Sequence, residues 1–82
     1  MATGSIKLNI LSPEKTLFSG DVASVSLPGL KAPFVVLYNH APIMSVLNKG
    51  FICWSGNNEG EVAIAGGFVV VKDNEVTVCV EV

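Results

Sequence analysis

The histidine and the two cysteines of this sequence, His40, Cys53 and Cys79, are of types that carry nucleophilic catalysis or bind zinc. Nucleophilic catalysis would pair the histidine with one of the cysteines and would add an acid to orient the imidazole ring. A zinc site would need about four ligands, or about three ligands and a water molecule. Nothing local supports either arrangement, and a lone histidine in a loop is usually a hydrogen-bonded structural residue. We therefore expect no catalysis, no metal and no cofactor.

The acidic residues give no clearer sign of an active site. Asp21, Glu59 and Glu61 read as ordinary turn and surface charges, although the sequence alone does not decide whether two carboxylates meet at catalytic spacing. The glycines at 29, 66 and 67 do not form a phosphate-binding loop, because that loop needs a strand-to-helix turn.

The composition points to surfaces that are covered by partner proteins. Half of the 82 residues are hydrophobic and only 15% are charged, against about 25% charged in an average soluble domain. A domain this small has much surface for its volume, so it should need more charge rather than less. We favour partner proteins as the cover, with an aggregation-prone monomer as the alternative.

Charge also excludes one class of partner. The net charge is −2 and the chain has no arginine, so it lacks the clustered cations that nucleic-acid binding needs. No signal peptide or membrane-spanning helix is recognisable, since the longest mostly apolar run, 62–71, contains two glycines and is too short. We expect a soluble cytoplasmic protein whose two cysteines are reduced packing residues rather than a disulfide.

The hydrophobic pattern predicts an all-β fold in one domain, residues 1–82. Apolar and polar residues alternate with the period of a strand that has one buried face. No segment has helical periodicity or a capping box. Short strands at close spacing, with turn residues between them, are typical of a small antiparallel β-sandwich or barrel. The expected strands are residues 6–10, 16–19 (ended by Gly20), 22–27, 34–37, 43–47, 51–55, 62–65, 68–71 and 75–82.

Two stretches interrupt this regular pattern. Residues 27–50 hold three of the four prolines and the only histidine, and we look for function here because irregular backbone carries function more often than regular strands do. Gly66 and Gly67 interrupt an apolar stretch near the end, where a glycine pair indicates a bulge or a close backbone contact.

Six short motifs in a fixed order carry a resemblance to a known family. They are PEKTLFSG at 13–20, LPG at 27–29, FVVL at 34–37, HAP at 40–42, NKG at 48–50 and GGF at 66–68. Each motif alone is weak, but their order and spacing together are specific. The chain resembles the N-terminal β-sandwich domain of the epsilon subunit of the F-type ATP synthase, from about residue 6 to residue 82.

The sequence departs from this family at several positions. Ala32 and Val35 stand where the family usually has glycines, and Tyr38-Asn39 stands where it usually has Pro-Gly, so we expect a stiffer central loop. In most family members a helical hairpin follows the sandwich, whereas this sequence stops at Val82. We expect a naturally short subunit rather than a truncated one.

The resemblance implies a rotor part rather than a catalyst. Epsilon and the gamma subunit form the foot of the central stalk, which rests on the membrane ring of c subunits and couples ion flow to ATP synthesis. The implied partners are gamma and the c-ring. The implied location is the cytoplasmic face of the bacterial inner membrane, peripheral and without direct insertion.

The resemblance also suggests a contact site. The candidate c-ring contact is Leu30, Lys31, Ala32 and Pro33, with His40 expected close by; the alternative is a solvent-exposed turn with a structural histidine. No gamma-facing residue is assigned. We expect Phe68 in the core and Trp54 in a packing role.

Two other classes of function remain open. A free-standing β-sandwich module that binds a peptide or sugar would show a concave groove lined by aromatic residues, but the six aromatics are scattered. A small enzyme would show several polar residues converging in a pocket. A neighbouring gene for the ATP synthase beta subunit would distinguish the rotor hypothesis from both.

Overall fold

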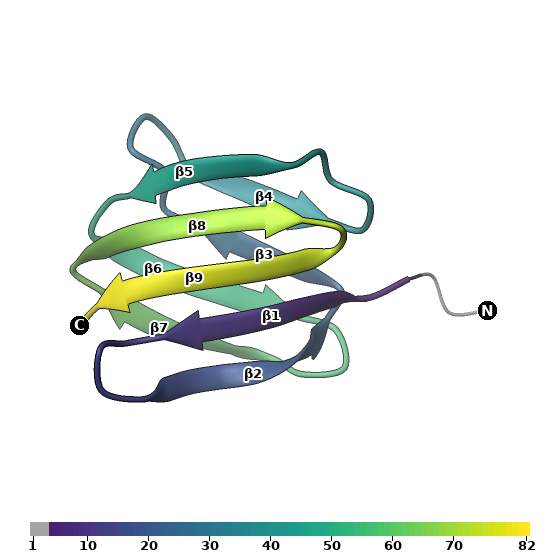
Figure 1. Cartoon of the computed structure of the whole chain (residues 1–82), viewed down its shortest axis with the longest axis horizontal. Helices are drawn as coiled ribbons and strands as arrows, with labels where there is room; N and C mark the ends of the chain where they lie inside the picture. The colour runs from purple at the N-terminus through teal and green to yellow at the C-terminus, as the bar shows by residue number, and fades with distance from the viewer. Residues whose placement is uncertain (1–3) are drawn as a thin grey trace.

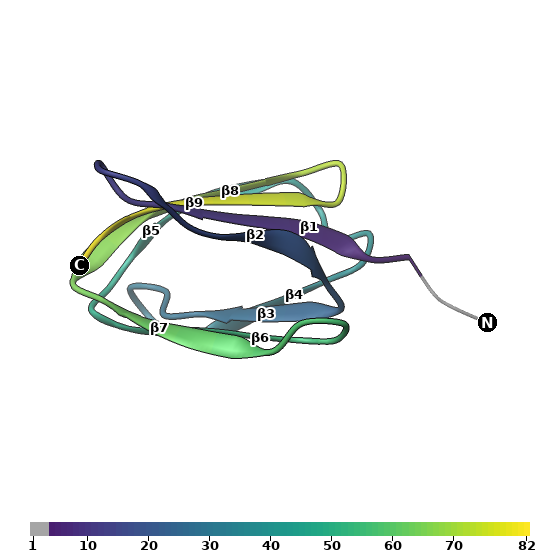
Figure 2. The same cartoon turned by 90° about the horizontal axis from the view of Figure 1, so that it is seen from below.

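The computed structural model describes residues 4–82, which form two β-sheets and no helix. Figures 1 and 2 show the sheets as two stacked layers, so the predicted β-sandwich is confirmed. One sheet has five strands in the order β2-β1-β9-β8-β5, and the other has four in the order β4-β3-β6-β7. The strands are β1 (Ile6–Leu11), β2 (Thr16–Val22), β3 (Ser24–Leu27), β4 (Phe34–Leu37), β5 (Ile43–Leu47), β6 (Gly50–Ser55), β7 (Gly60–Ile64), β8 (Gly66–Lys72) and β9 (Glu75–Glu81).

All strand pairs are antiparallel except one. β1 lies parallel to β9, with Leu8 opposite Val76 and Ile10 opposite Val78. This pair brings the first and last strands together in the middle of the five-stranded sheet. The first and last strands of the described residues are therefore hydrogen-bonded to each other.

The core lies between the two sheets and is wholly apolar. In β1 the buried residues are Ile6, Leu8 and Ile10, so alternate side chains point inward as the sequence predicted. Among the described residues, no polar or charged residue is buried. Full burial of an aliphatic side chain of this size contributes about 1.5–3 kcal/mol. Because several such side chains alternate along the strand, the pattern largely determines which face of the strand turns toward the core.

Two aromatic residues, Phe18 on β2 and Trp54 on β6, pack against each other between the two sheets. The rings of Phe18 and Trp54 are 4.6 Å apart between centroids and are tilted by 33°. Both side chains pack against the core while remaining partly exposed. The packing role predicted for Trp54 is therefore confirmed, although its buried Nε1 has no hydrogen-bond partner in the described structure.

The strand boundaries differ from the prediction around Gly20. Gly20 does not end a strand, since β2 continues to Val22, which is buried opposite Ile6. The chain then passes to the other sheet at Ala23, whose amide donates to the carbonyl of Ser55 (2.7 Å). Gly20 lies within the edge strand β2, opposite Leu8 of β1.

The Gly66-Gly67 pair marks a close backbone contact and not a bulge. The register of β8 with β9 is continuous from Gly66 opposite Glu81 to Lys72 opposite Glu75. Gly67 has φ 152°, and a Cβ built there would lie 2.2 Å from the carbonyl oxygen of Cys79. Of the two alternatives that the glycine pair offered, only the close contact is correct.

Phe68 lies outside the core, so its predicted burial is wrong. Its side chain is 47% exposed, whereas Val69 and Val71 on the same strand are buried. The run from 68 to 71 is continuously apolar, and such a run does not reveal which alternate residues face inward. Phe68 and Val70 face outward instead.

Two turns meet at one end of the sandwich. Asp73 (φ 53°) and Asn74 (φ 61°) form the predicted hairpin turn, and Asn39 (φ 63°) has the same left-handed backbone. The Asn39 amide donates to the Asn74 side chain, whose Nδ2 donates back to Asn39 Oδ1 (3.1 Å). Asparagine tolerates this conformation better than most residues, so Asn39 can hold the left-handed backbone without a glycine.

Within residues 4–82 there is no helix long and apolar enough to cross a membrane.

Candidate functional site

The residues with catalytic potential do not come together. Cys53 on β6 and Cys79 on β9 belong to different sheets and are both unpaired. Their neighbours in sequence, Ile52 and Val80, are buried, so each cysteine faces outward with the core between them. His40 lies in the β4–β5 connection, where its Nδ1 is 2.8 Å from the carbonyl oxygen of Ala41. No group of three His, Cys, Asp or Glu side chains suited to a metal exists among the described residues.

The candidate ring-contact residues form one projecting loop between β3 and β4, which we call the 30–33 loop. Leu30, Lys31, Ala32 and Pro33 are all exposed, Leu30 by 60%. Together with Gly29, Phe34 and Ser45 they line a shallow hollow of about 450 Å³.

The base of the 30–33 loop is anchored to the end of β5. The Asn48 amide donates to the carbonyl of Pro28 (2.7 Å), and Gly29 forms an isolated β-bridge with Leu47. A Cβ at Gly29 would lie 2.6 Å from the carbonyl oxygen of Ala32, so only glycine lets the loop fold back this tightly. The exposed residues are thus held on a fixed base.

His40 does not lie close to the 30–33 loop, so that expectation is wrong. β4 separates them, and the β3–β4 and β4–β5 connections lie at opposite ends of the sandwich (Figure 1). A four-residue strand spans roughly 13 Å. The proximity of these residues in sequence was misleading because the strand between them is fully extended.

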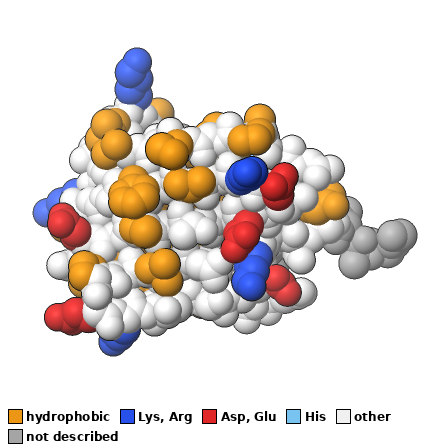
Figure 3. Space-filling view, viewed as in Figure 1, with side chains coloured by type: hydrophobic (Ala, Val, Ile, Leu, Met, Phe, Trp, Pro, Cys, Tyr) orange, Lys and Arg blue, Asp and Glu red, His pale blue; other side chains and the backbone are white. Residues whose placement is uncertain are grey.

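The outer face of the five-stranded sheet carries a surface that the sequence analysis did not identify, here called the outer apolar patch. One row runs across four strands, with Val46 opposite Phe68, Phe68 opposite Cys79, and Cys79 opposite Leu11. Met44 and Val70 form a neighbouring pair. Figure 3 shows apolar side chains gathered over this part of the face. The patch is Leu11, Met44, Val46, Phe68, Val70 and Cys79.

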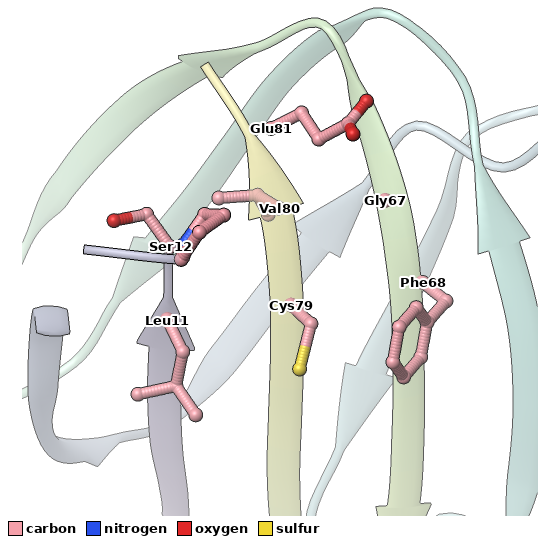
Figure 4. A pocket seen from close by; sticks show the side chains of 8 residues that line it. Leu11, Ser12, Gly67, Phe68, Cys79, Val80 and Glu81 are labelled. Atoms are coloured by element: carbon pink, nitrogen blue, oxygen red, sulfur yellow. The ribbon is translucent and has the colours of Figure 1, made fainter. Parts of the chain in front are cut away.

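The patch includes a hollow and some of the most exposed apolar side chains. Met44 is 78% exposed and Val46 is 56% exposed. Leu11, Cys79 and Phe68 lie side by side on β1, β9 and β8 (Figure 4) and help to line a hollow of about 420 Å³. Phe68 is the only aromatic residue in this lining, so the hollow is not the aromatic groove expected of a sugar- or peptide-binding module.

The other half of the same face is charged. Lys72, Glu75, Lys7 and Asp21 follow one another across β8, β9, β1 and β2, with opposite signs on neighbouring strands. Figure 3 shows acidic and basic side chains on this face, away from the gathered apolar side chains. A partner that covers this face therefore meets an apolar half and an alternating charged half, which restricts how it can be oriented.

The central stretch of the sequence is also the most exposed apolar part of the described structure. Nine large hydrophobic side chains are exposed in residues 4–82, and six of them lie between residues 30 and 46. These six are Leu30, Val35, Leu37, Tyr38, Met44 and Val46. Val35 and Leu37 lie on β4 in the four-stranded sheet, whereas Met44 and Val46 lie on β5 in the five-stranded sheet. The chain is therefore a β-sandwich with exposed apolar side chains on strands of both sheets.

The comparisons with known proteins place the chain in a family. Residues 5–82 match the model of the ATP synthase delta/epsilon chain, beta-sandwich domain. The chain is 43% identical over 73 residues to an ATP synthase epsilon chain of Wolinella succinogenes and 35% identical over 79 residues to one of Leptospira interrogans. It belongs to the ATP synthase delta/epsilon chain family, as its β-sandwich domain, and the resemblance seen in the sequence is confirmed.

The matches also define the extent of the likeness. The aligned regions cover 89% and 95% of this chain but only 56% and 62% of those two relatives, so the chain spans roughly three-fifths of their length. Two solved structures share the fold at low sequence identity. They are a Tetrahymena thermophila mitochondrial ATP synthase central stalk and c-ring (TM-score 0.83, 19% identity, 100% of this chain and 67% of that chain) and a Euglena gracilis mitochondrial ATP synthase assembly (TM-score 0.86, 20% identity, 93% and 50%).

Proposed function

We propose that this chain works as a non-catalytic part of the central stalk of an F-type ATP synthase, where it links the gamma subunit to the c-ring and couples ion flow to ATP synthesis. The observation that carries the proposal is the family match over residues 5–82. The relatives are named ATP synthase epsilon chain, and the two structural neighbours come from assemblies that include a c-ring. The corresponding location is the cytoplasmic face of the bacterial inner membrane, held there through the complex.

The two docking surfaces suit these two partners. The 30–33 loop projects from one end on a fixed base, which suits a contact that transmits lateral force to the ring. The outer apolar patch lies on the broad side of the sandwich and suits the larger interface with gamma. Covering Met44, Val46 and Phe68 would contribute of the order of 1 kcal/mol each before other costs of association are counted.

Substitution of Phe68 by lysine tests the gamma-facing patch. We expect Phe68→Lys to weaken binding to the cognate gamma subunit by about tenfold or more, because a charge would then face an apolar interface. The fold should survive, since this side chain is already 47% exposed. Affinity is measured by isothermal titration calorimetry with purified gamma.

Phe51 provides the matched control on the other sheet. Phe51 is also an exposed phenylalanine (57%), and its side chain lies on the outer face of the four-stranded sheet. Phe51→Lys should leave gamma affinity within about twofold of wild type. Equal losses in the two variants would contradict the assignment of the patch, and no binding by the wild-type chain would contradict the proposed function itself.

A further inference from the structure

The outer face of the five-stranded sheet carries two rows of side chains that cross the strands. Figure 1 shows β8 and β9 in the middle of this face. The charged row follows β8, β9, β1 and β2 and consists of Lys72, Glu75, Lys7 and Asp21. The apolar row follows β5, β8, β9 and β1 and consists of Val46, Phe68, Cys79 and Leu11. Both rows cross the boundary between β8 and β9, so symmetry about that boundary acts on both at once.

The charged row is complementary to itself. If a two-fold axis runs along the strands between β8 and β9, a second copy of the chain lies on the face with its β9 over the first copy's β8. Lys72 of one copy then faces Glu75 of the other, and the symmetry repeats this contact, so two ion pairs form. Sheets that stack face to face keep their strand directions within about 30° of each other, as this arrangement requires.

The apolar row meets itself about the same axis. Phe68 of one copy faces Cys79 of the other, Val46 faces Leu11, and each contact occurs twice. Phe68 is 47% exposed and Val46 is 56% exposed in the single chain. The pairing therefore removes from water apolar surface that a monomer leaves open.

An axis one strand further along, between β9 and β1, is less favourable. It would bring together all four charges of the charged row. However, it would place Phe68 over the edge strand β2 and Val46 beyond the other copy's sheet. Exposed ion pairs contribute less than buried apolar side chains do, so the match of the apolar rows selects the axis between β8 and β9.

The overlap of the two copies is too small for a permanent dimer. Four strands have a width of about 19 Å, and the seven residues of β8 have a length of about 23 Å. Each copy therefore covers roughly 400 Å² of the other, and the pair buries roughly 800 Å² in all, below the 1,200 Å² or so that separates weak from stable complexes. Such a dimer forms reversibly, and a partner with a larger interface can displace it.

We propose that the free chain forms a weak two-fold symmetric dimer through the outer face of its five-stranded sheet, with Lys72 of each copy paired to Glu75 of the other. The dimer covers the outer apolar patch while the chain is outside the synthase. The same patch is the surface proposed to meet gamma, so the dimer must dissociate before gamma docks. That last step rests on the proposed stalk function, whereas the dimer itself does not.

The two cysteines allow the interface to be identified. Cys79 lies beside the proposed axis on β9, whereas Cys53 lies on β6 in the other sheet, and both are half-buried. A short bismaleimide should crosslink the Cys53→Ser chain into a dimer, to an extent that grows with concentration, because Cys79 of the two copies would lie close together. The Cys79→Ser chain should stay monomeric. Crosslinking through Cys53 instead, or through neither cysteine, would overturn the proposal.

Charge variants test the pairing itself. Lys72→Glu and Glu75→Lys should each weaken self-association by about tenfold or more, because two attractive contacts become repulsive. An equimolar mixture of the two variants should associate again, since each variant supplies the charge that the other lacks. Analytical ultracentrifugation measures the dissociation constants, and circular dichroism shows that the variants are folded. Failure of the mixture to associate would overturn the predicted ion pairs.

Asp21→Lys is the matched control, because it makes the same change of charge as Glu75→Lys in the same row. Asp21 lies on β2, beyond the overlap of the two copies, so this variant should keep the dissociation constant within about twofold of wild type. Equal losses in the two variants would overturn the choice of axis. A wild-type chain that stays monomeric at every concentration would overturn the dimer.

Cognate gamma distinguishes the dimer from the proposed stalk function. Saturating gamma should abolish the crosslink through Cys79, because both partners need the same face. A crosslink that persists while gamma is bound would overturn the shared face. Failure of gamma to bind would refute the stalk function, while a Cys79 crosslink in the chain alone would still support the dimer.

Discussion

Replacement of residues 30–33 by a Gly-Ser-Gly-Ser sequence is expected to reduce ion pumping several-fold for each ATP hydrolysed by the assembled synthase. The change removes the apolar surface of Leu30, the charge of Lys31 and the backbone restriction of Pro33. It leaves the buried core and the anchoring bond from Asn48 to Pro28 in place. The measurement is ATP-driven ion uptake into membrane vesicles, normalised to the hydrolysis rate.

Two controls show whether the effect belongs to the loop. Lys31→Ala alone should change little, because an exposed ion pair contributes only about 0.2–1 kcal/mol. Asn57→Ser with Glu59→Ser alters the β6–β7 connection at the opposite end of the sandwich (Figure 1) and should leave coupling unchanged. Normalised pumping at the wild-type level in the loop variant would show that residues 30–33 are an ordinary exposed turn.

Gly67→Ala should destabilise the fold by about 2–4 kcal/mol, because it combines an unfavourable backbone conformation with a steric clash. The added Cβ would lie 2.2 Å from the carbonyl oxygen of Cys79 and 2.9 Å from the Cα of Val80, at φ 152°. These atoms are backbone in the neighbouring β9, so a side-chain rotation cannot relieve the contact. Urea unfolding followed by Trp54 fluorescence measures the change.

The adjacent glycine is the matched control for this clash. At Gly66 the nearest atom to an added Cβ is the carbonyl oxygen of Leu47 at 3.8 Å, an ordinary contact distance. Gly66→Ala should therefore change the free energy of unfolding by less than about 1 kcal/mol. Similar losses at the two positions would mean that the close approach of β8 and β9 at Gly67 does not restrict the side chain.

How much of the fold the sequence predicts depends on how clearly each strand alternates. In β1 and β9 apolar residues occupy every second position, and the buried residues are the predicted ones. In β8 the run from 68 to 71 is apolar throughout, so the outward position of Phe68 follows only from its pairing with β9 and β5. Strand existence is encoded locally, whereas the choice of face in such a run depends on tertiary contacts.

The two candidate docking surfaces differ in the same way: one consists of sequence neighbours, and the other consists of residues that strand pairing brings together. The 30–33 loop could be located from its flanking turn residues, because those residues are neighbours in sequence. The outer apolar patch could not, because Leu11, Val46, Phe68 and Cys79 become neighbours only through the register of four strands. His40 was misplaced for the opposite reason: it is near the loop in sequence, but the extended strand β4 holds it away.

Affinity purification of the assembled synthase through a tag on this chain tests its place in the stalk most directly. Membranes are solubilised in mild detergent, and the bound subunits are quantified by mass spectrometry. We expect gamma and the c subunits to be recovered with the chain, and gamma to remain bound after the c-ring has been dissociated. Recovery of the chain without gamma, from membranes in which gamma purifies with the rest of the synthase, would contradict the account.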